Sequence, residues 1–348
     1  MSKLDDMFYY LKSDSKMLSI DVGSTSVKFL MIRKADDRYR LHYEILDENL
    51  YDLDHDDTAD IKKKICEITE LLCVKKNTPV YVSFSHDIQI SKEENMRQVM
   101  TELKHQWLAI PFGLKKNITA TEFSNVYLLT PQRKIDEIVE LFHECNITIS
   151  GYSLSPLALP RASNALFSED EWYDTTAIVD IGAKEILCCV TAGYYVFSLR
   201  KFYYGGEKLK EIIKEHLRVK TVDKEFLCAE FCKSPQVVRE AIMKEFLYDL
   251  KHYFAALVID RDIIPKRVVV SGGVARLPRI AQYMTKAIKI PTQTWGIRGG
   301  LHIKHSISGQ RQFLYDEPAL AVAMGMLSKD IVMIEGPDKG HNKKIVML

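Results

Sequence analysis

Two short segments, one in each half of the chain, have the same pattern. Each is an apolar strand that ends on an acidic residue and leads directly into a glycine turn: residues 20–26 (Ile-Asp-Val-Gly-Ser-Thr-Ser) and 179–183 (Val-Asp-Ile-Gly-Ala). A third glycine turn, at 271–275, follows the apolar strand at 267–270. Each turn alone is a weak signal, but the three in this order predict a nucleotide-binding cleft between two similar domains.

The composition is that of a globular protein large enough for two domains. The chain has 348 residues, of which 47% are hydrophobic and 27% charged. The net charge of +1 and the lack of a basic tract with interleaved aromatics argue against nucleic-acid binding. No signal peptide is visible, and no apolar run reaches the roughly 18–20 residues of a membrane helix. We therefore expect a cytoplasmic protein with no direct membrane insertion.

The cysteines are scattered without a paired pattern, which is typical of free thiols in a reducing compartment. There are seven: Cys66, Cys73, Cys145, Cys188, Cys189, Cys228 and Cys232. Cys228 and Cys232 have a spacing that can hold a metal on a helix, but no second pair lies nearby to complete such a site. We expect no metal there.

The order of strands and helices predicts an α/β fold made of two similar halves. Residues 17–84 show three strands, a helix with apolar residues at helical spacing over 61–74, and a fourth strand. This order is typical of a ribonuclease-H-like half-domain. The pattern restarts after 172–175 with three strands over 177–203, so we expect an internal duplication with a cleft between the halves.

The first glycine turn carries donors suited to a phosphate chain. Gly23 lets the backbone approach a phosphate, and Ser24, Thr25 and Ser26 add hydroxyl donors. Asp21 would meet a magnesium ion, usually through water, because magnesium keeps several of its waters. An ordinary hairpin turn between core strands explains the segment equally well.

The second turn is poorer in donors, because Ala183, Lys184 and Glu185 follow Gly182. Lys184 can pair with a phosphate, whereas Glu185 would repel it. The plainer interpretation, a hairpin turn, gains weight here.

Two further glycine pairs precede expected helices. Gly205 and Gly206 can present free N–H groups to a nucleotide, although glycines are also common in plain connections. Gly272 and Gly273 would let the backbone pass under a purine ring, and a tight strand-to-helix turn is the alternative.

These residues resemble the phosphate and adenosine motifs of the actin-like ATPases, and within that group the PilM family of type IV pilus assembly proteins. The segments that carry the resemblance are 20–28, 106–112, 204–209, 272–278 and 316–325. The more specific of them are Ile-Pro-Phe at 110–112 and Asp-x-Pro-Ala-Leu-Ala-Val-Ala-x-Gly at 316–325. The resemblance covers about residues 18–328.

The resemblance implies an actin-like fold, a duplicated ribonuclease-H-like fold of two domains, with bound ATP and Mg²⁺. It implies that Asp21 and Asp180 meet the metal. The residues implied to contact the nucleotide are Gly23, Ser24, Thr25, Ser26, Lys28, Gly182, Ala183, Lys184, Gly205, Gly206, Lys208, Gly272, Gly273, Val274 and Arg276.

The resemblance and the pattern of segments together predict a division of the chain. We expect an N-terminal segment at 1–16, domain 1 at 17–172 with an inserted subdomain at about 79–126, and domain 2 at 173–330 with a helical subdomain at about 205–265. A C-terminal tail follows at 331–348, and its residues 336–348 are expected to be loose.

The family also implies a partner, the N-terminal peptide of a PilN-like inner-membrane protein, which would bind in a groove beside the insert. A homo-oligomer or ring under the inner membrane would follow. Trp107, Ile110 and Phe112 would line or support this groove, and core packing within the insert is the alternative.

Two departures from the family pattern favour ATP binding with slow or absent hydrolysis, or the loss of nucleotide binding altogether. Ser155 stands where relatives usually have an acidic residue before the proline, and the second turn lacks hydroxyls. We therefore expect at most a weak ATPase activity. The expected function is that of an ATP-binding scaffold of a type IV pilus or type II secretion platform.

Two other functions remain open. An FtsA-like cell-division tether usually ends in an amphipathic membrane helix, and residues 341–348 are too short for one. A small-molecule kinase would need a catalytic acid or base near the turns, where Asp21 and Asp180 are expected at the metal instead.

Overall fold

The computed structural model describes residues 15–35, 38–51, 58–85, 87–92, 107–162, 167, 169–193, 195–222, 233, 236–296, 301–303, 317–328, 332–335 and 345–347. The chain forms two compact units. Unit 1 comprises Met1–Gly113, Asn125–Phe167 and Gly296–Leu348, and unit 2 comprises Leu114–Ser124 and Ser168–Trp295.

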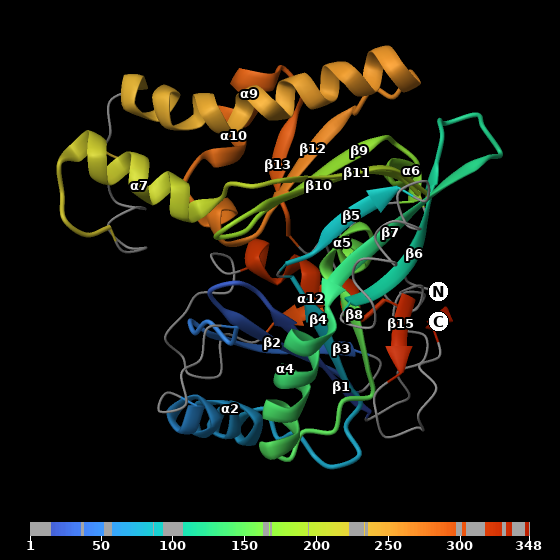
Figure 1. Ribbon diagram of the computed structural model, residues 1–348, viewed down its shortest axis with the longest axis vertical. Helices are drawn as coiled ribbons and strands as arrows, with labels where there is room; N and C mark the ends of the chain where they lie inside the picture. Colours follow the sequence, from blue (N-terminus) through green and yellow to red (C-terminus); the bar gives the residue numbers. More distant parts are fainter. Residues whose placement is uncertain are drawn as a thin grey trace. The chain divides into compact units, whose positions relative to one another are not determined.

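Unit 1 is built on an eight-stranded mixed sheet of order β14-β3-β2-β1-β4-β8-β15-β16 (Figure 1). Strands β1, β2 and β3 form an antiparallel meander, while β4 and β8 continue the sheet parallel to β1. The side chains of β1 from Met17 to Val22 are all buried, as expected of a central strand. The strands are β1 Lys16–Val22, β2 Val27–Ala35, β3 Arg38–Leu46, β4 Val80–Phe84, β8 Gly151–Leu154, β14 Leu301–Ile303, β15 Val332–Glu335 and β16 Ile345–Met347.

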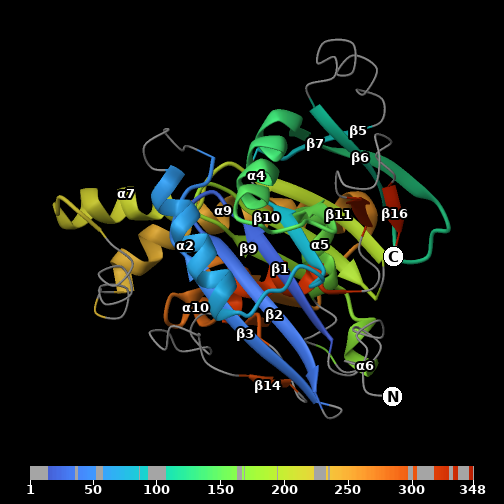
Figure 2. The same ribbon diagram turned by 90° about the horizontal axis from the view of Figure 1, so that it is seen from below.

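Helices α2 (Thr58–Leu71) and α4 (Gln132–Glu144) lie along one face of β1–β3 (Figure 2). Apolar residues at helical spacing explain this arrangement, because Ile61, Ile65 and Ile68 are the buried side of α2. On α4, Phe142 meets Phe29 of β2 edge to face, with ring centroids 6.5 Å apart.

Unit 1 also contains residues 317–328, which the sequence analysis assigned to the end of domain 2. The 3-10 helix η3 (Glu317–Leu320) leads into α12 (Ala321–Met326), which packs against α5 (Ser155–Ala162) and contacts β1 and β4. Gly325 lies against the backbone of Ala158 with no room for a side chain. This close packing joins residues 317–328 to unit 1, whereas the expected domain 2 ran to residue 330.

The inserted sheet has the order β5-β7-β6 and comprises β5 (Gln89–Lys92), β6 (Trp107–Lys115) and β7 (Phe123–Pro131). Because β4 belongs to the main sheet, the insert begins after Phe84 and not at residue 79. Pro111 lies in β6 at the edge of this sheet, where a missing N–H is tolerated. The helix expected at 93–105 lies outside the described residues.

Unit 2 has a five-stranded sheet of order β11-β10-β9-β12-β13 (Figure 1). Its pairings are antiparallel from β9 to β11 and parallel through β12 to β13, the same pattern as β3-β2-β1-β4-β8 of unit 1. The predicted duplication is therefore confirmed. The strands are β9 Thr176–Ile181, β10 Ile186–Ala192, β11 Tyr195–Phe202, β12 Arg267–Ser271 and β13 Thr292–Thr294.

The helices of unit 2 are α6 (Glu169–Trp172), α7 (Gly206–Leu217), α9 (Gln236–Arg261) and α10 (Ile280–Ile288), with the 3-10 helix η2 (Gly273–Arg276). Leu250, Phe254 and Leu257 of α9 are buried in one core with β9, β10 and β12. The core thus fixes α9 against the sheet, and α7 packs on α9.

Two parts of the C-terminal segment that the structure describes, 332–335 and 345–347, form strands, and the second of them lies in the part predicted to be loose. Strand β15 pairs antiparallel with β8, and β16 pairs with β15. Short apolar, β-branched runs at both places explain the difference, because they suit strand pairing. The N-terminal segment up to residue 14, and also Cys228 and Cys232, lie outside the described residues.

Among the helices that the structure describes, none has both the length and the apolar character needed to cross a bilayer.

Candidate functional site

The first glycine turn, in unit 1, is organised around a buried carboxylate. Asp21 lies near the end of β1 with 2% of its surface exposed. The Lys28 ammonium lies 2.8 Å from its Oδ2, and the Ser85 hydroxyl donates to its Oδ1 at 2.8 Å. Lys28 reaches it because Asp21 and Lys28 are opposite each other in the β1–β2 ladder. Both carboxylate oxygens are therefore engaged.

The backbone of this turn closes on itself, because the Gly23 N–H donates to the Ser26 carbonyl at 3.0 Å. Ser24 is buried, whereas Thr25 and Ser26 are half-buried. The turn thus holds three hydroxyl side chains next to the Asp21–Lys28 pair.

The second turn, in unit 2, has the same backbone and different side chains. The Gly182 N–H donates to the Glu185 carbonyl at 3.0 Å, and Asp180 accepts a 2.8 Å hydrogen bond from the hydroxyl of Ser271 on β12. The residue opposite Asp180 on β10 is Leu187, where unit 1 has a lysine. Glu185 forms an ion pair with Lys201.

The turn before α7 packs directly on the second turn. The Gly206 N–H donates to the Gly182 carbonyl at 2.9 Å, and the Glu207 N–H donates to the Ala183 carbonyl at 2.8 Å. A Cβ on Gly205 would lie 2.5 Å from the Gly182 oxygen. The prediction of a free N–H at Gly206 is therefore wrong. The two glycines let the backbones approach closely, and the Gly206 N–H is satisfied by the Gly182 carbonyl.

The third turn meets the second one from the other side. Gly272 has φ +87°, and a Cβ there would lie 2.5 Å from the Ile181 oxygen. Val274 lies next to Gly206, and Arg276 is half-buried. Around Gly273 the space is open, because nothing lies within 4 Å of the position of a Cβ. An open glycine on this turn fits the expected approach of a flat ring.

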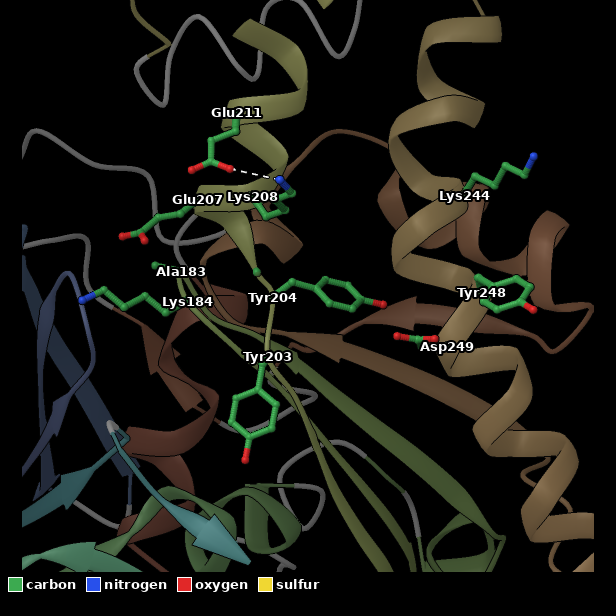
Figure 3. Close-up of a pocket in the computed structure, with 11 residues that line it drawn as sticks. Ala183, Lys184, Tyr203, Tyr204, Glu207, Lys208, Glu211, Lys244, Tyr248 and Asp249 are labelled. Atoms are coloured by element: carbon green, nitrogen blue, oxygen red, sulfur yellow. Dashed lines mark hydrogen bonds and ion pairs between the residues drawn. The ribbon is translucent and has the colours of Figure 1, made fainter. Parts of the chain in front are cut away.

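A pocket of about 750 Å³ opens beside the second turn, between α7 and α9 (Figure 3). It contains four of the predicted residues: Ala183, Lys184, Gly205 and Lys208. The residues that sequence analysis missed are Tyr203, Tyr204, Glu207, Glu211, Lys244, Tyr248 and Asp249. The sequence could have indicated Tyr203 and Tyr204, because they come directly before the glycine pair. It gave no signal for the three residues of α9, which reach the pocket through the packing of that helix.

Phenol rings and opposite charges share this pocket. Lys208 pairs with Glu211 at 3.2 Å (Figure 3). The Tyr204 hydroxyl donates to the Phe246 carbonyl at 2.8 Å. The second bond ties the β11–α7 connection to α9. Such a lining suits a ring with polar substituents better than a purely anionic group.

Comparison with known proteins decides the family. Residues 19–329 match the family model described as the type IV pilus assembly protein PilM. The chain belongs to the PilM family.

Solved structures share this fold at low sequence identity. A PilM-PilN type IV pilus biogenesis complex matches with a TM-score of 0.63 and 14% identity over 90% of this chain and 97% of that one. The ethanolamine utilization protein EutJ from Carboxydothermus hydrogenoformans matches with a TM-score of 0.52 and 11% identity over 93% and 94%. MreB5 of Spiroplasma citri bound to ADP matches with a TM-score of 0.49 and 10% identity over 89% and 94%. The fold is the actin-like ATPase fold.

The predicted site residues divide between the two units. Asp21, Lys28 and the turn at 23–26 belong to unit 1, and the remaining ones, all within 180–276, belong to unit 2. Within unit 2 the structure brings the second turn, the glycine pair and the third turn into one cluster. Within unit 1 it brings the first turn and Lys28 together.

The donor set fits phosphate more directly than it fits a metal. In the described part of the chain, no three His, Cys, Asp or Glu side chains form a metal cluster. A magnesium ion at Asp21 would compete with the Lys28 ammonium and the Ser85 hydroxyl. Magnesium needs few protein ligands, since it keeps waters, so Asp21 and Asp180 stay predicted metal contacts.

In the insert, Ile110 is 1% exposed and packs in the core, while Trp107 and Phe112 on the same strand are half-buried. Ser155 is buried at the start of α5.

Proposed function

We propose that this member of the PilM family is an ATP-binding scaffold of the inner-membrane platform of a type IV pilus or type II secretion machine. The observation that carries the proposal is the matched pair of Asp-x-Gly turns. Each turn has the same 3.0 Å backbone closure and the same 2.8 Å bond from a serine to the aspartate.

The first turn supplies the phosphate contacts in this proposal. Thr25 and Ser26 are half-buried hydroxyl donors, and the Lys28 ammonium can turn from Asp21 toward an anionic oxygen. Magnesium would neutralise phosphate charge at this turn, where Asp21 would hold its waters, and Asp180 is the corresponding proposed metal contact of unit 2. The third turn, open at Gly273, and the tyrosine-lined pocket of unit 2 would receive the base and ribose.

Hydrolysis is slow or absent in this proposal. A carboxylate can orient and activate an attacking water, whereas the neutral Ser155 cannot act as a base of that kind. Nucleotide would then set the conformation of the protein, and partner binding would be its output.

The proposed partner is the N-terminal peptide of a PilN-like inner-membrane protein, which would hold the scaffold at the membrane periphery. The PilM-PilN complex among the similar structures supports this choice. The proposed contact is the inserted sheet, where Trp107 and Phe112 of β6 are accessible in part. A homo-oligomer or ring would follow from repeated docking on that platform.

The proposal is tested by titrating ATP with Mg²⁺ into the full chain in a calorimeter, alongside a phosphate-release assay. We expect saturable binding with little phosphate release, and at least tenfold weaker binding in Asp21→Ala. The exposed Asp260 offers a matched control, since Asp260→Ala should bind like wild type. Rapid phosphate release would contradict the scaffold, and equal affinity in Asp21→Ala would remove Asp21 from the site.

A further inference from the structure

Two cysteine thiols from different elements meet in unit 1. Cys66 lies on α2, and Cys145 is the C-cap residue directly after α4. Cys145 Sγ lies 3.8 Å from the Lys62 carbonyl, which is one helical turn before Cys66 on α2, so the two thiols are neighbours. Both are free thiols; Cys66 is half-buried and Cys145 is buried.

The surroundings hold these thiols in place. Lys62 of α2 forms an ion pair with Glu144, which is adjacent to Cys145, and α2 packs against α4. The Cys145 N–H is bonded to the Phe142 carbonyl at 3.0 Å, so the end of α4 is fixed. A disulfide needs an S–S distance of about 2.05 Å. The packing of α2 against α4 places Cys145 Sγ beside the helical turn that carries Cys66, so a small movement of the side chains can close this distance.

We propose that Cys66 and Cys145 are a redox modification site, at which a hydroperoxide joins α2 to the end of α4 through a disulfide. This site is independent of nucleotide binding, since it lies on the helices of unit 1 and uses none of the glycine turns.

The chemistry needs two steps. The Cys66 thiolate attacks one oxygen of hydrogen peroxide; the O–O bond breaks, and Cys66 becomes a sulfenic acid while the leaving hydroxide takes up the thiol proton as water. The Cys145 sulfur then attacks the Cys66 sulfur; the S–O bond breaks, and the hydroxide leaves with the Cys145 proton as a second water. Two thiols lose two electrons, and one peroxide is reduced to two waters.

The different exposure of the two thiols assigns their roles. Cys66 is accessible in part and is oxidised first, because oxidation follows thiolate character and exposure. Burial, together with the Cys66 contact, raises the pKa of the Cys145 thiol to about 12. Cys145 is therefore the resolving thiol, and the second step should accelerate as the pH rises.

The chain contains good internal controls. Cys73, just after α2, is exposed. Cys188 and Cys189 adjoin on β10, where neighbours point to opposite faces of the sheet, and both are fully buried.

The test treats the full chain with hydrogen peroxide, blocks remaining thiols with N-ethylmaleimide, and maps tryptic peptides without reductant by mass spectrometry. Cys66 and Cys73 share the tryptic peptide 65–75, so Cys73 in it should carry N-ethylmaleimide. We expect this alkylated peptide linked through Cys66 to the peptide of Cys145, 2 Da lighter than the sum of the two separate peptides, and dithiothreitol should separate the pair. Cys66→Ser should abolish the link, Cys73→Ser should keep it, and the rate should rise between pH 7 and pH 9.

A second readout keeps the test informative if a variant folds poorly. Oxidation should raise the thermal midpoint of wild type by several degrees, because the cross-link closes a long loop of chain. The midpoint of Cys66→Ser should not rise. Full alkylation of both cysteines after peroxide treatment, or over-oxidation of Cys66 with Cys145 still free, would overturn the proposal.

Discussion

The two Asp-x-Gly turns differ in their side chains and agree in their backbone. In each, the glycine N–H donates to the carbonyl three residues later at 3.0 Å, and a serine donates to the aspartate at 2.8 Å. The first turn surrounds its aspartate with Ser24, Thr25, Ser26 and Lys28; the corresponding residues of the second turn are Ala183, Lys184, Glu185 and Leu187.

This difference suggests that the duplicated frame serves two purposes. In unit 1 the turn holds donors beside a buried ion pair, and in unit 2 its carbonyls accept the N–H groups of Gly206 and Glu207 at the start of α7. Duplication preserves the ladder geometry, which the strands dictate. The side chains that the ladder does not constrain are free to diverge.

The largest expected effect lies where the second and third turns touch. Gly272→Ala should lower the free energy of unfolding by about 3 kcal/mol, because φ +87° is a region that suits only glycine and the new Cβ would meet the Ile181 carbonyl. The neighbour Gly273 is open, so Gly273→Ala should change stability by less than about 0.5 kcal/mol. Urea titration measures both, and equal effects would contradict the close backbone contact.

A smaller effect separates the two aspartates. Asp21→Ala leaves the Lys28 ammonium, only 14% exposed, without its partner, and should cost about 2 kcal/mol of unfolding free energy. Asp180→Ala should cost about 1 kcal/mol through the lost Ser271 bond. Urea titration of both variants measures these losses. A larger loss of unfolding free energy in Asp180→Ala than in Asp21→Ala would contradict the expected order.

The charged residue of the second turn should matter less. Glu185→Gln removes the negative charge beside Lys201, whose side chain is 8% exposed, and we expect a loss of about 1 kcal/mol. Ser26→Ala at the matching position of the first turn should be nearly neutral for stability. If Ser26→Ala proves the more destabilising of the two, the first turn is a structural element and not a donor site.

The smallest effect is a dependence of unit 2 on pH. The hydrogen bond from Lys266, with Arg267 nearby, holds the pKa of Asp174 below its ordinary value of 3.8. A lowered folded pKa means that this contribution is complete above the ordinary value and disappears as the pH falls through the folded pKa. Asp174→Asn should therefore unfold slightly more easily than wild type at pH 6, and this difference should shrink as the pH falls below 3.8, as measured by thermal melts across that range.

Local patterns predicted the elements that depend on neighbours in the chain. The strand before each glycine turn, the apolar stripe of α2 and the duplication all follow from spacing within short windows. The pairing of Asp21 with Ser85, and that of Asp180 with Ser271, could not be read this way, because the serines lie on or just after a parallel neighbouring strand.

The contacts that the sequence did not reveal are long-range. The return of α12 to unit 1 depends on its fit against α5, and the pocket residues Lys244, Tyr248 and Asp249 depend on how α9 packs beside α7. The loose tail was expected because residues 336–348 are polar overall, yet β15 and β16 pair through short apolar runs. In each of these cases, tertiary packing decided what local composition could not.

The central claim is that the first turn, and not the second, supplies the phosphate donors. A calorimetric titration of ATP with Mg²⁺ into wild type, the Thr25→Val/Ser26→Ala double variant and Lys184→Ala tests it most directly. We predict a loss of affinity of at least tenfold in the double variant and a clearly smaller loss in Lys184→Ala, with both folded by circular dichroism. Binding that survives in the double variant but is lost in Lys184→Ala would contradict the claim.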